Sequence, residues 1–179
     1  MDVLGLETYA IEIRLILREL GIPESYATDR RLELQVETNR SVSAGRDIYD
    51  RELRLTPEGL EAWNNLRSNA LKDGIVLQVI SGFRRVSYQR GIIERKLATG
   101  LHIQEILKSS AAPGFSEHHT GRALDLTTPG ATVLHSDFEH TAAFVWLARN
   151  AAFLGFRMSF PRGNPHGIIY EPWHWYFQG

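Results

Sequence analysis

Two short stretches of this 179-residue chain carry side chains that could bind a metal ion and move a proton. The first, residues 116–125, reads SEHHTGRALD, and the second, residues 170–176, reads YEPWHWY. The chain has no cysteine, so a metal site would have to use histidine, aspartate or glutamate. Both stretches supply these residue types inside segments that otherwise resemble parts of a hydrophobic core.

Asp125 stands in an apolar segment that is typical of a buried strand. In a strand, Leu124 and Leu126 would share one face and Asp125 would lie on the other. Burying a carboxylate without a partner costs several kcal/mol, so Asp125 needs a cation or hydrogen-bond donors. His118 precedes it with Gly121 between them, so the two could converge on one metal ion. The alternative is that Asp125 caps a turn and His118 lies on the surface.

The second stretch places a carboxylate, Glu171, shortly before a histidine, His174. In a regular strand these two side chains point to opposite faces, but a bulge at Pro172 would bring them to one side. Two histidines and one aspartate leave the fourth position of a tetrahedral zinc site for water, and a glutamate that is not a ligand could take the proton of that water. The aromatic neighbours would form dry walls around the ligands, although simple core packing also accounts for Trp175.

A third polar group follows the apolar run of residues 75–80. Residues 81–89 read SGFRRVSYQ, a glycine turn followed by the start of a helix. Such a turn places side chains at the rim of a sheet, where Arg84 and Gln89 could bind a carboxylate or an oxyanion. Arg85 is a surface charge in the simpler interpretation.

The spacing of apolar residues predicts the elements that must position these groups. Helical spacing is found over residues 7–20, 56–72, 86–99 and 138–153, and Thr56 and Pro57 form an N-cap signal. Strands are expected over residues 32–36, 75–80, 124–126 and 167–176. The fold class is therefore α+β, with a small antiparallel sheet that carries the metal site and helices packed against it.

The bulk properties predict one globular domain and exclude several partners. Hydrophobic residues make up 43% and charged residues 23%, and the formal net charge of -1 gives no basic surface for nucleic acid. No apolar run reaches the length of a transmembrane segment. The first 20 residues form an amphipathic pattern and not a signal peptide, which leaves the route of any export open.

These three motifs together resemble those of the VanY-type D-alanyl-D-alanine carboxypeptidases, zinc peptidases that trim the stem peptides of bacterial peptidoglycan. The family pattern S-x-H-x-x-G-x-A-x-D is matched by residues 116–125, and the pattern E-P-W-H-W by residues 171–175. The segment S-G-Y-R-S is matched loosely, with Phe83 and Arg85 in place of tyrosine and serine. The resemblance covers roughly residues 55–179, so we expect a single zinc peptidase domain with a helical N-terminal extension over residues 1–54.

The resemblance implies a role for each matched residue. It implies one Zn²⁺ held by His118, Asp125 and His174. It makes Glu171 the catalytic base and Arg84 the group that stabilises the tetrahedral intermediate. Substrate-binding residues would be Gln89, Ser116 and Trp173. His119 matches a variable position, and His166 is interpreted as a loop residue.

One segment departs from the family pattern. Many relatives carry Arg-Tyr-Pro after the Gly-Phe that corresponds to Gly155 and Phe156, whereas residues 157–161 here read RMSFP. This difference leaves the exact peptide specificity open, since it could change which terminal bond fits.

The function predicted by the resemblance is removal of the C-terminal D-alanine from peptidoglycan stem peptides. Two alternatives share the fold: an L,D-carboxypeptidase and an endopeptidase that cuts L-alanyl-D-glutamate. An alternative of another class is a binding module that keeps the metal and not the catalysis. The resemblance places the protein at the cell envelope or outside the cell, with a cytoplasmic location still open, and it leaves the oligomeric state unassigned.

Overall fold

The computed structural model describes residues 3–179. Its α-helices are α1 (Val3–Glu19), α2 (Tyr26–Asp29), α3 (Pro57–Lys72), α4 (Val86–Ala98), α5 (Ile103–Ser109) and α6 (Ala142–Asn150). Short 3-10 helices are η1 (Glu117–Thr120), η2 (Ser136–His140) and η3 (Ala151–Leu154). The strands are β1 (Val42–Arg46), β2 (Glu52–Leu55), β3 (Gln78–Ser81), β4 (Ala123–Thr127), β5 (Phe156–Met158) and β6 (His174–Phe177). Within residues 3–179, no helix combines the length and apolar character needed to cross a membrane.

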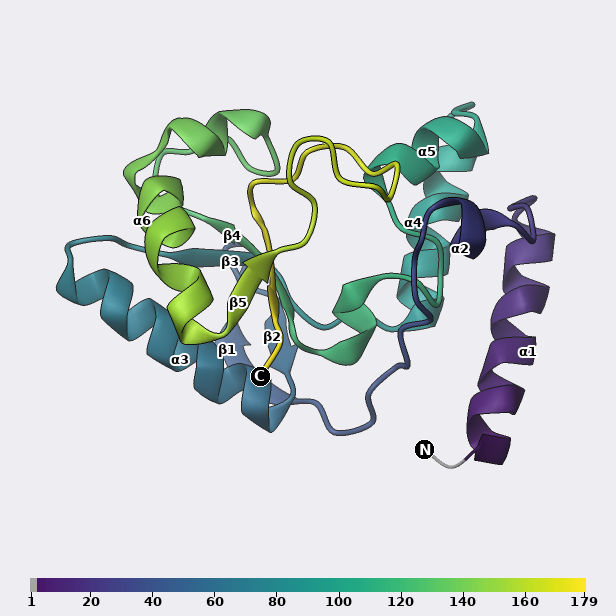
Figure 1. Cartoon of the computed structure of the whole chain (residues 1–179), viewed down its shortest axis with the longest axis horizontal. Helices are drawn as coiled ribbons and strands as arrows, with labels where there is room; N and C mark the ends of the chain where they lie inside the picture. Colours follow the sequence, from purple (N-terminus) through teal and green to yellow (C-terminus); the bar gives the residue numbers. More distant parts are fainter. Residues whose placement is uncertain (1–2) are drawn as a thin grey trace.

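A four-stranded antiparallel sheet lies at the centre of the molecule, with strand order β3-β4-β6-β5 (Figure 1). All residues of β4 are buried, because this strand has a neighbour on each side and helices or loops over its faces. Strands β1 and β2 form a separate antiparallel hairpin. The α+β fold class with a small antiparallel sheet is therefore confirmed.

The buried apolar side chains form two hydrophobic cores. The first joins α3 and α6 to one face of the sheet and includes Trp63, Leu66, Leu124, Leu126 and Leu147. The second joins α1, α4 and α5 and includes Ile13, Leu17, Ile93, Ile106 and Phe115. Figure 1 shows α3 and α6 on one side of the strands, and α1, α4 and α5 on the other.

Helix α3 begins where the sequence predicted. The Thr56 hydroxyl accepts a hydrogen bond from the Gly59 amide at 3.1 Å, which satisfies one of the free N–H groups of the first turn, and Pro57 occupies the first helical position. The Thr56 amide donates to the Gly121 carbonyl at 3.0 Å. The start of α3 thereby fixes the turn that precedes β4.

Other predicted boundaries were wrong. Residues 32–36 are extended but not a strand, because their backbone bonds to loops, as from the Gln35 amide to the Gly114 carbonyl at 2.7 Å. The helix predicted over 138–153 is divided into η2, α6 and η3, since the Thr141 hydroxyl caps a new helix at the Phe144 amide. Residues 1–54, predicted as a helical extension, also contain β1 and part of the β1–β2 hairpin.

The N-terminal segment packs on the loop that leads into the first motif. Ile13 of α1 lies against Gly114, and a Cβ added at Gly114 would come within 2.6 Å of the Ile13 side chain. The Tyr26 hydroxyl accepts a hydrogen bond from the Ala112 amide at 3.0 Å, and a Glu37 carboxylate oxygen accepts from the Val86 amide at 2.6 Å, at the start of α4. These contacts join α1 and α2 to the segments that carry the predicted site.

Substituting Gly114 tests this packing. Gly114 and Gly130 have nearly equal φ angles, +84° and +83°, but a Cβ at Gly130 would meet nothing within 4 Å. We expect Gly130→Ala to cost about 1–2 kcal/mol of unfolding free energy because of the left-handed backbone. Gly114→Ala should cost about 1–3 kcal/mol more, because the added Cβ would clash with the buried side chain of Ile13. Urea denaturation of both variants measures the difference, and equal losses would contradict the contact.

Candidate metal and catalytic site

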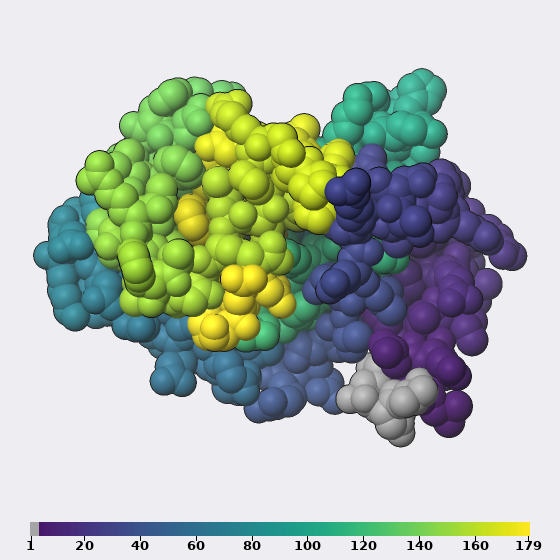
Figure 2. All heavy atoms as spheres, in the orientation of Figure 1, coloured from purple at the N-terminus to yellow at the C-terminus, as the bar shows by residue number. Residues whose placement is uncertain are grey.

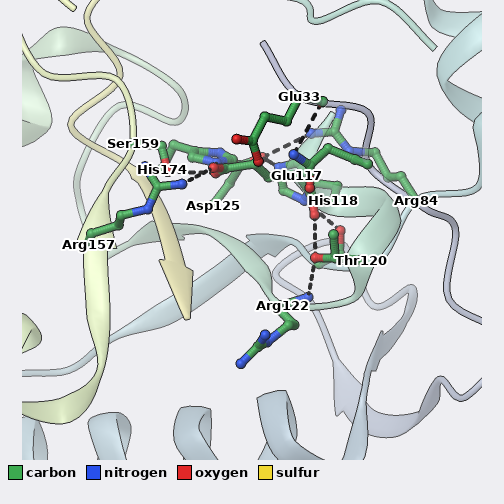
Figure 3. Close-up of polar contacts among 12 residues, drawn as sticks. Glu33, Arg84, Glu117, His118, Thr120, Arg122, Asp125, Arg157, Ser159 and His174 are labelled. Carbon is green, nitrogen blue, oxygen red and sulfur yellow. Dashed lines mark hydrogen bonds and ion pairs between the residues drawn. The ribbon is translucent and has the colours of Figure 1, made fainter. Parts of the chain in front are cut away.

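Strand pairing brings the predicted metal ligands together. Asp125 of β4 lies directly opposite His174 of β6 and also pairs with Ser81 of β3. Leu124 and Leu126 point into the core beneath the sheet, as the alternation predicted. His118 lies in η1, which ends at Gly121 with a φ of +69°, so the chain reverses there and enters β4. The side chains of His118, Asp125 and His174 meet above the sheet (Figure 3).

His118 presents a free lone pair to Asp125. Its Nδ1 lies 2.6 Å from the Gly82 carbonyl oxygen. A carbonyl only accepts hydrogen bonds, so Nδ1 carries the proton and Nε2 does not. Nε2 is buried without a hydrogen bond and faces the Asp125 Oδ2 at 3.2 Å. Two electron-rich atoms at this distance repel each other unless a cation lies between them, so the pair fits a bound metal ion.

His174 reaches the same carboxylate through a turn. The His174 amide donates to the Glu171 carbonyl at 3.1 Å, so residues 171–174 form a turn and β6 begins only at His174. The predicted bulge at Pro172, and the predicted strand over residues 167–176, are therefore wrong. His174 Nδ1 lies 3.0 Å from Asp125 Oδ1, and its Nε2 lies 2.9 Å from Glu117 Oε2.

The pKa values of the three possible ligands differ, and they determine how metal binding would depend on pH. Burial lowers the pKa of His118 to about 4, and the charge of Arg84 acts in the same direction. Burial alone would raise the pKa of Asp125, but the hydrogen bond from His174 and its positive charge hold that pKa below its usual range. Burial alone would lower the pKa of His174, but hydrogen bonds to Asp125 and Glu117 raise it to about 10. A metal on His174 must therefore displace a proton, and affinity should fall in acid.

The three side chains can hold one metal ion. One ligand atom from each of His118, Asp125 and His174 lies within 4.8 Å of the others, and all three residues are buried. Two imidazoles and one carboxylate form a donor set that zinc accepts, with a further coordination position left for water or substrate. Within residues 3–179 this group does not include Glu171.

Glu171 and Arg84 line the same cavity as the histidines. The cavity has a volume of about 40 Å³ and lies between the end of α5 and the loop before β6. Burial raises the pKa of Glu171 to about 7. The positive charges of His174 and Arg84 oppose this rise, and the negative charge of Asp125 adds to it. The Arg84 guanidinium lies 3.6 Å from Asp125 Oδ2, and burial lowers its pKa.

The predicted substrate-binding residues have different surroundings. Gln89 and Ser116 are buried and line the cavity, and Gln89 accepts a hydrogen bond from Arg84 at 3.2 Å. Trp173 instead packs in the core that joins α3 and α6 to the sheet, and it does not line the cavity. This placement does not support substrate binding by Trp173. The sequence shows that Trp173 is a large aromatic residue, but this does not indicate whether its side chain packs in the core or lines the cavity.

Glu117 holds the outer nitrogen of His174 and was missed by the sequence reasoning. Its carboxylate also accepts hydrogen bonds from Arg157 at 2.6 Å and from Ser159 at 2.5 Å (Figure 3). Burial raises the pKa of Glu117, but His174, Ser159 and Arg157 together bring it below its ordinary value. Arg157, which belongs to the segment that departs from the family pattern, therefore binds Glu117. The only signal for this role in the sequence was the position of Glu117 directly before His118, a predicted ligand.

His119 connects two segments of the site, although the sequence offered no role for it. Its Nε2 accepts a hydrogen bond from the Gly114 amide at 3.1 Å, so its Nδ1 carries the proton and donates to the Arg84 carbonyl at 2.7 Å. The Arg84 amide in turn donates to the His118 carbonyl at 3.1 Å. The backbone of Arg84 is therefore fixed from both directions. His166, interpreted as a loop residue, lies in the loop before β6 and contacts the Arg30 carbonyl at 2.9 Å.

Fold and site together define the class: an α+β domain with two buried histidines and a buried aspartate that can hold one metal ion, beside a half-buried glutamate in the same cavity. The family model described as VanY, D-alanyl-D-alanine carboxypeptidase, matches residues 52–179. This chain belongs to the VanY family. The family match includes every predicted site residue.

The chain is similar to several curated proteins and solved structures, and two of each illustrate the likeness. YodJ of Bacillus subtilis (strain 168), named as a carboxypeptidase, is 29% identical over 93% of this chain and 60% of its own length. A D-alanyl-D-alanine carboxypeptidase of Enterococcus faecalis (strain ATCC 700802 / V583) is 28% identical over 92% of this chain and 58% of its own length. The chain thus spans about 60% of the length of these relatives.

The LdcB LD-carboxypeptidase structure has a TM-score of 0.72 and 26% identity, covering 80% of this chain and 70% of that one. VanYB in complex with D-alanine-D-alanine has a TM-score of 0.62 and 25% identity, covering 82% of this chain and 86% of that one. Both similarities cover most of this chain, so the arrangement of helices and strands described above is that of known family structures.

Replacing Glu117 tests its support of the metal site. In Glu117→Gln the side chain keeps its size but loses the charge that holds the His174 Nε2 proton, and its amide faces the Arg157 and Ser159 donors. Loss of such a partner typically weakens metal binding about 10–100-fold. Competition with a chromogenic chelator measures zinc affinity. Glu52→Gln, which removes an exposed carboxylate paired with Arg54, is the control; unchanged affinity in Glu117→Gln would refute the role.

Proposed function

We propose that this chain is a zinc-dependent carboxypeptidase that removes the C-terminal D-alanine from peptidoglycan stem peptides. The observation that carries the proposal is the half-buried Glu171, which lines the cavity of the three possible metal ligands but is not one of that group. The family description and the names of the relatives support the same activity. The protein would then act at the bacterial cell wall.

Glu171 is the proposed general base. Zinc, when bound, supplies a Lewis acid that lowers the pKa of coordinated water and polarises a carbonyl group. Glu171 takes up a proton and later gives it to the leaving amine. Burial raises the pKa of Glu171 above its ordinary value, and a group that must accept and return a proton works best when its pKa lies near the ambient pH.

Arg84 is the proposed donor to the developing oxyanion. Its guanidinium is held by Gln89 and Asp125, and its Nε is buried without a hydrogen bond. Hydrogen bonds with His118 and His119 fix the position of the Arg84 backbone. A cationic donor fixed before the reaction stabilises charge that appears only in the transition state.

A second candidate is L,D-carboxypeptidase activity on tetrapeptide stems. It is favoured by the TM-score of 0.72 with LdcB, against 0.62 with VanYB. The altered segment, residues 157–160, lies next to the metal ligands through Arg157 and Ser159. An endopeptidase would not require a group for a terminal carboxylate, and a non-catalytic module would have no need for Glu171.

Substituting Glu171 separates catalysis from metal binding. We expect Glu171→Gln to retain one zinc per chain, since Glu171 is not in the ligand group. Its turnover should fall by about two to four orders of magnitude, because an amide cannot accept the proton. Elemental analysis and a cleavage assay check the two expectations. Loss of zinc together with activity would make Glu171 a ligand, and full activity would remove it from the mechanism.

Stem peptides of different length test the substrate. Zinc-loaded protein is incubated with pentapeptide and tetrapeptide stems, each as the free acid and as the C-terminal amide, and products are identified by mass spectrometry. We expect release of D-alanine from the free pentapeptide and little reaction with the amides, because a site built for a carboxylate rejects its neutral analogue.

Other product patterns would change the assignment. Cleavage of the tetrapeptide alone would assign L,D-activity, and equal cleavage of acids and amides would exclude an exopeptidase.

A further inference from the structure

A second and larger cavity lies beside the catalytic cavity, between α4, the end of β3 and the β1–β2 hairpin. Its volume is about 580 Å³, against about 40 Å³ for the cavity of Glu171 and the possible metal ligands. A cavity of this size can hold a small organic ligand. Arg84 is the one residue that lines both cavities, and the proposed mechanism makes no use of the larger one.

Positive charge exceeds negative charge around the larger cavity, which we call the arginine cavity. Asp47 already pairs with Arg51 at 2.6 Å. Glu52 pairs with Arg54 at 2.9 Å. Arg84 faces Asp125 at 3.6 Å. The charged residues of the lining are five arginines and two acids: Arg51, Arg54, Arg84, Arg85, Arg95, Asp47 and Glu52.

The charges of Arg85 and Arg95 are left without a carboxylate. Within residues 3–179 the Arg85 guanidinium makes no hydrogen bond, ion pair or ring contact. The Arg95 guanidinium has no ion pair in that range and lies 5.8 Å from the centre of the Tyr88 ring. Both arginines are exposed, so a ligand can reach them. An anion that enters the arginine cavity would meet two cations that no acid neutralises.

One face of α4 presents these groups to the arginine cavity. Arg85, Tyr88, Gly91 and Arg95 follow one another at intervals of three or four residues, a spacing that places them on the same side of the helix. A Cβ added at Gly91 would come within 3.1 Å of Arg95 Nη1. The absence of a side chain at Gly91 therefore leaves room for Arg95 to fold back along the helix toward Tyr88.

The lining favours a phosphate group over a carboxylate. A guanidinium binds either anion through two parallel N–H donors. A carboxylate carries one negative charge, whereas a phosphate group carries up to two and has oxygens enough for two arginines at once. Two unpaired guanidinium groups match the phosphate. The Tyr88 ring offers an apolar surface to the organic part of the ligand.

We propose that Arg85, Arg95 and Tyr88 form a binding site for a phosphate-bearing ligand in the arginine cavity. Arg85 stands where the family pattern has serine, so the site uses a residue that is outside the family motif. The ligand would lie beside the catalytic cavity, since Arg84 lines both. This inference goes beyond the proposed peptidase activity and does not depend on it.

The test is a nuclear magnetic resonance titration of the zinc-loaded full chain at constant ionic strength. The probes are inorganic phosphate, glycerol 3-phosphate, a diglycerol phosphodiester and, as the carboxylate, acetate. We expect the phosphate probes to shift the backbone amide signals of Tyr88 and Gly91, and acetate to bind about tenfold more weakly or worse. Tighter binding of glycerol 3-phosphate would indicate a small phosphomonoester as the ligand, and tighter binding of the diester would indicate a phosphodiester polymer.

Variants of the two free arginines locate the site. Arg85→Ser introduces the residue of the family pattern and should weaken phosphate binding about tenfold or more, because charged hydrogen bonds are lost. Arg95→Gln should have a similar effect. Arg149→Ser is the matched control, because Arg149 is an exposed arginine of α6 that does not line the arginine cavity and has no ion pair among the described residues. We expect its phosphate affinity to equal that of the wild type.

Three results would overturn the site. Amide shifts that are absent at Tyr88 and confined to the surroundings of Asp125 and His174 would place the phosphate on the zinc ion. An equal loss of affinity in Arg149→Ser would indicate a general effect of charge. Binding of acetate as tight as that of phosphate would exclude a phosphate site. The titration requires no turnover, so its result stands whether or not the chain cleaves stem peptides.

Discussion

The site depends on one buried carboxylate, Asp125. It lies in the central strand of the sheet, where every residue is buried, and a lone charge there would be strongly unfavourable. The strand register compensates by placing His174 directly opposite, and the turn at Gly121 brings His118 to the other oxygen. His118 offers a lone pair and not a proton to Asp125, so a cation between the two side chains would remove their repulsion. The same need for positive charge beside the buried carboxylate therefore explains why a metal ion fits this position.

A second layer of contacts orients this cluster. The Gly82 carbonyl sets the tautomer of His118, and Glu117 holds the outer nitrogen of His174. Arg157 and Ser159 in turn hold Glu117 from the segment around β5. Such outer contacts fix ring orientation and raise the basicity of the ligands, so residues that never touch the metal influence its affinity.

The N-terminal segment supports the site from outside the matched part of the family. It lies before residue 52, where the family match begins, yet Arg30 donates to the Leu107 carbonyl at 2.7 Å and to the Gly167 carbonyl at 3.1 Å. In Figure 2 the dark blue residues after α2 lie beside the yellow loop before β6. Arg30 therefore connects the two segments that border the cavity of Glu171 and the possible metal ligands, namely the end of α5 and that loop.

The sequence by itself determined the residue types of the site, the face on which Asp125 would lie, and the start of α3 at Thr56. These features follow from local rules: alternation along a strand, the absence of cysteine, and capping of a helix. Only the tertiary structure decided which partners each side chain meets. Arg157 reaches Glu117 across 40 residues, Lys96 meets Ser110 across 14, and Trp173 turns into the core. Local periodicity specifies a direction for a side chain, whereas its partners depend on packing between segments that are distant in the chain.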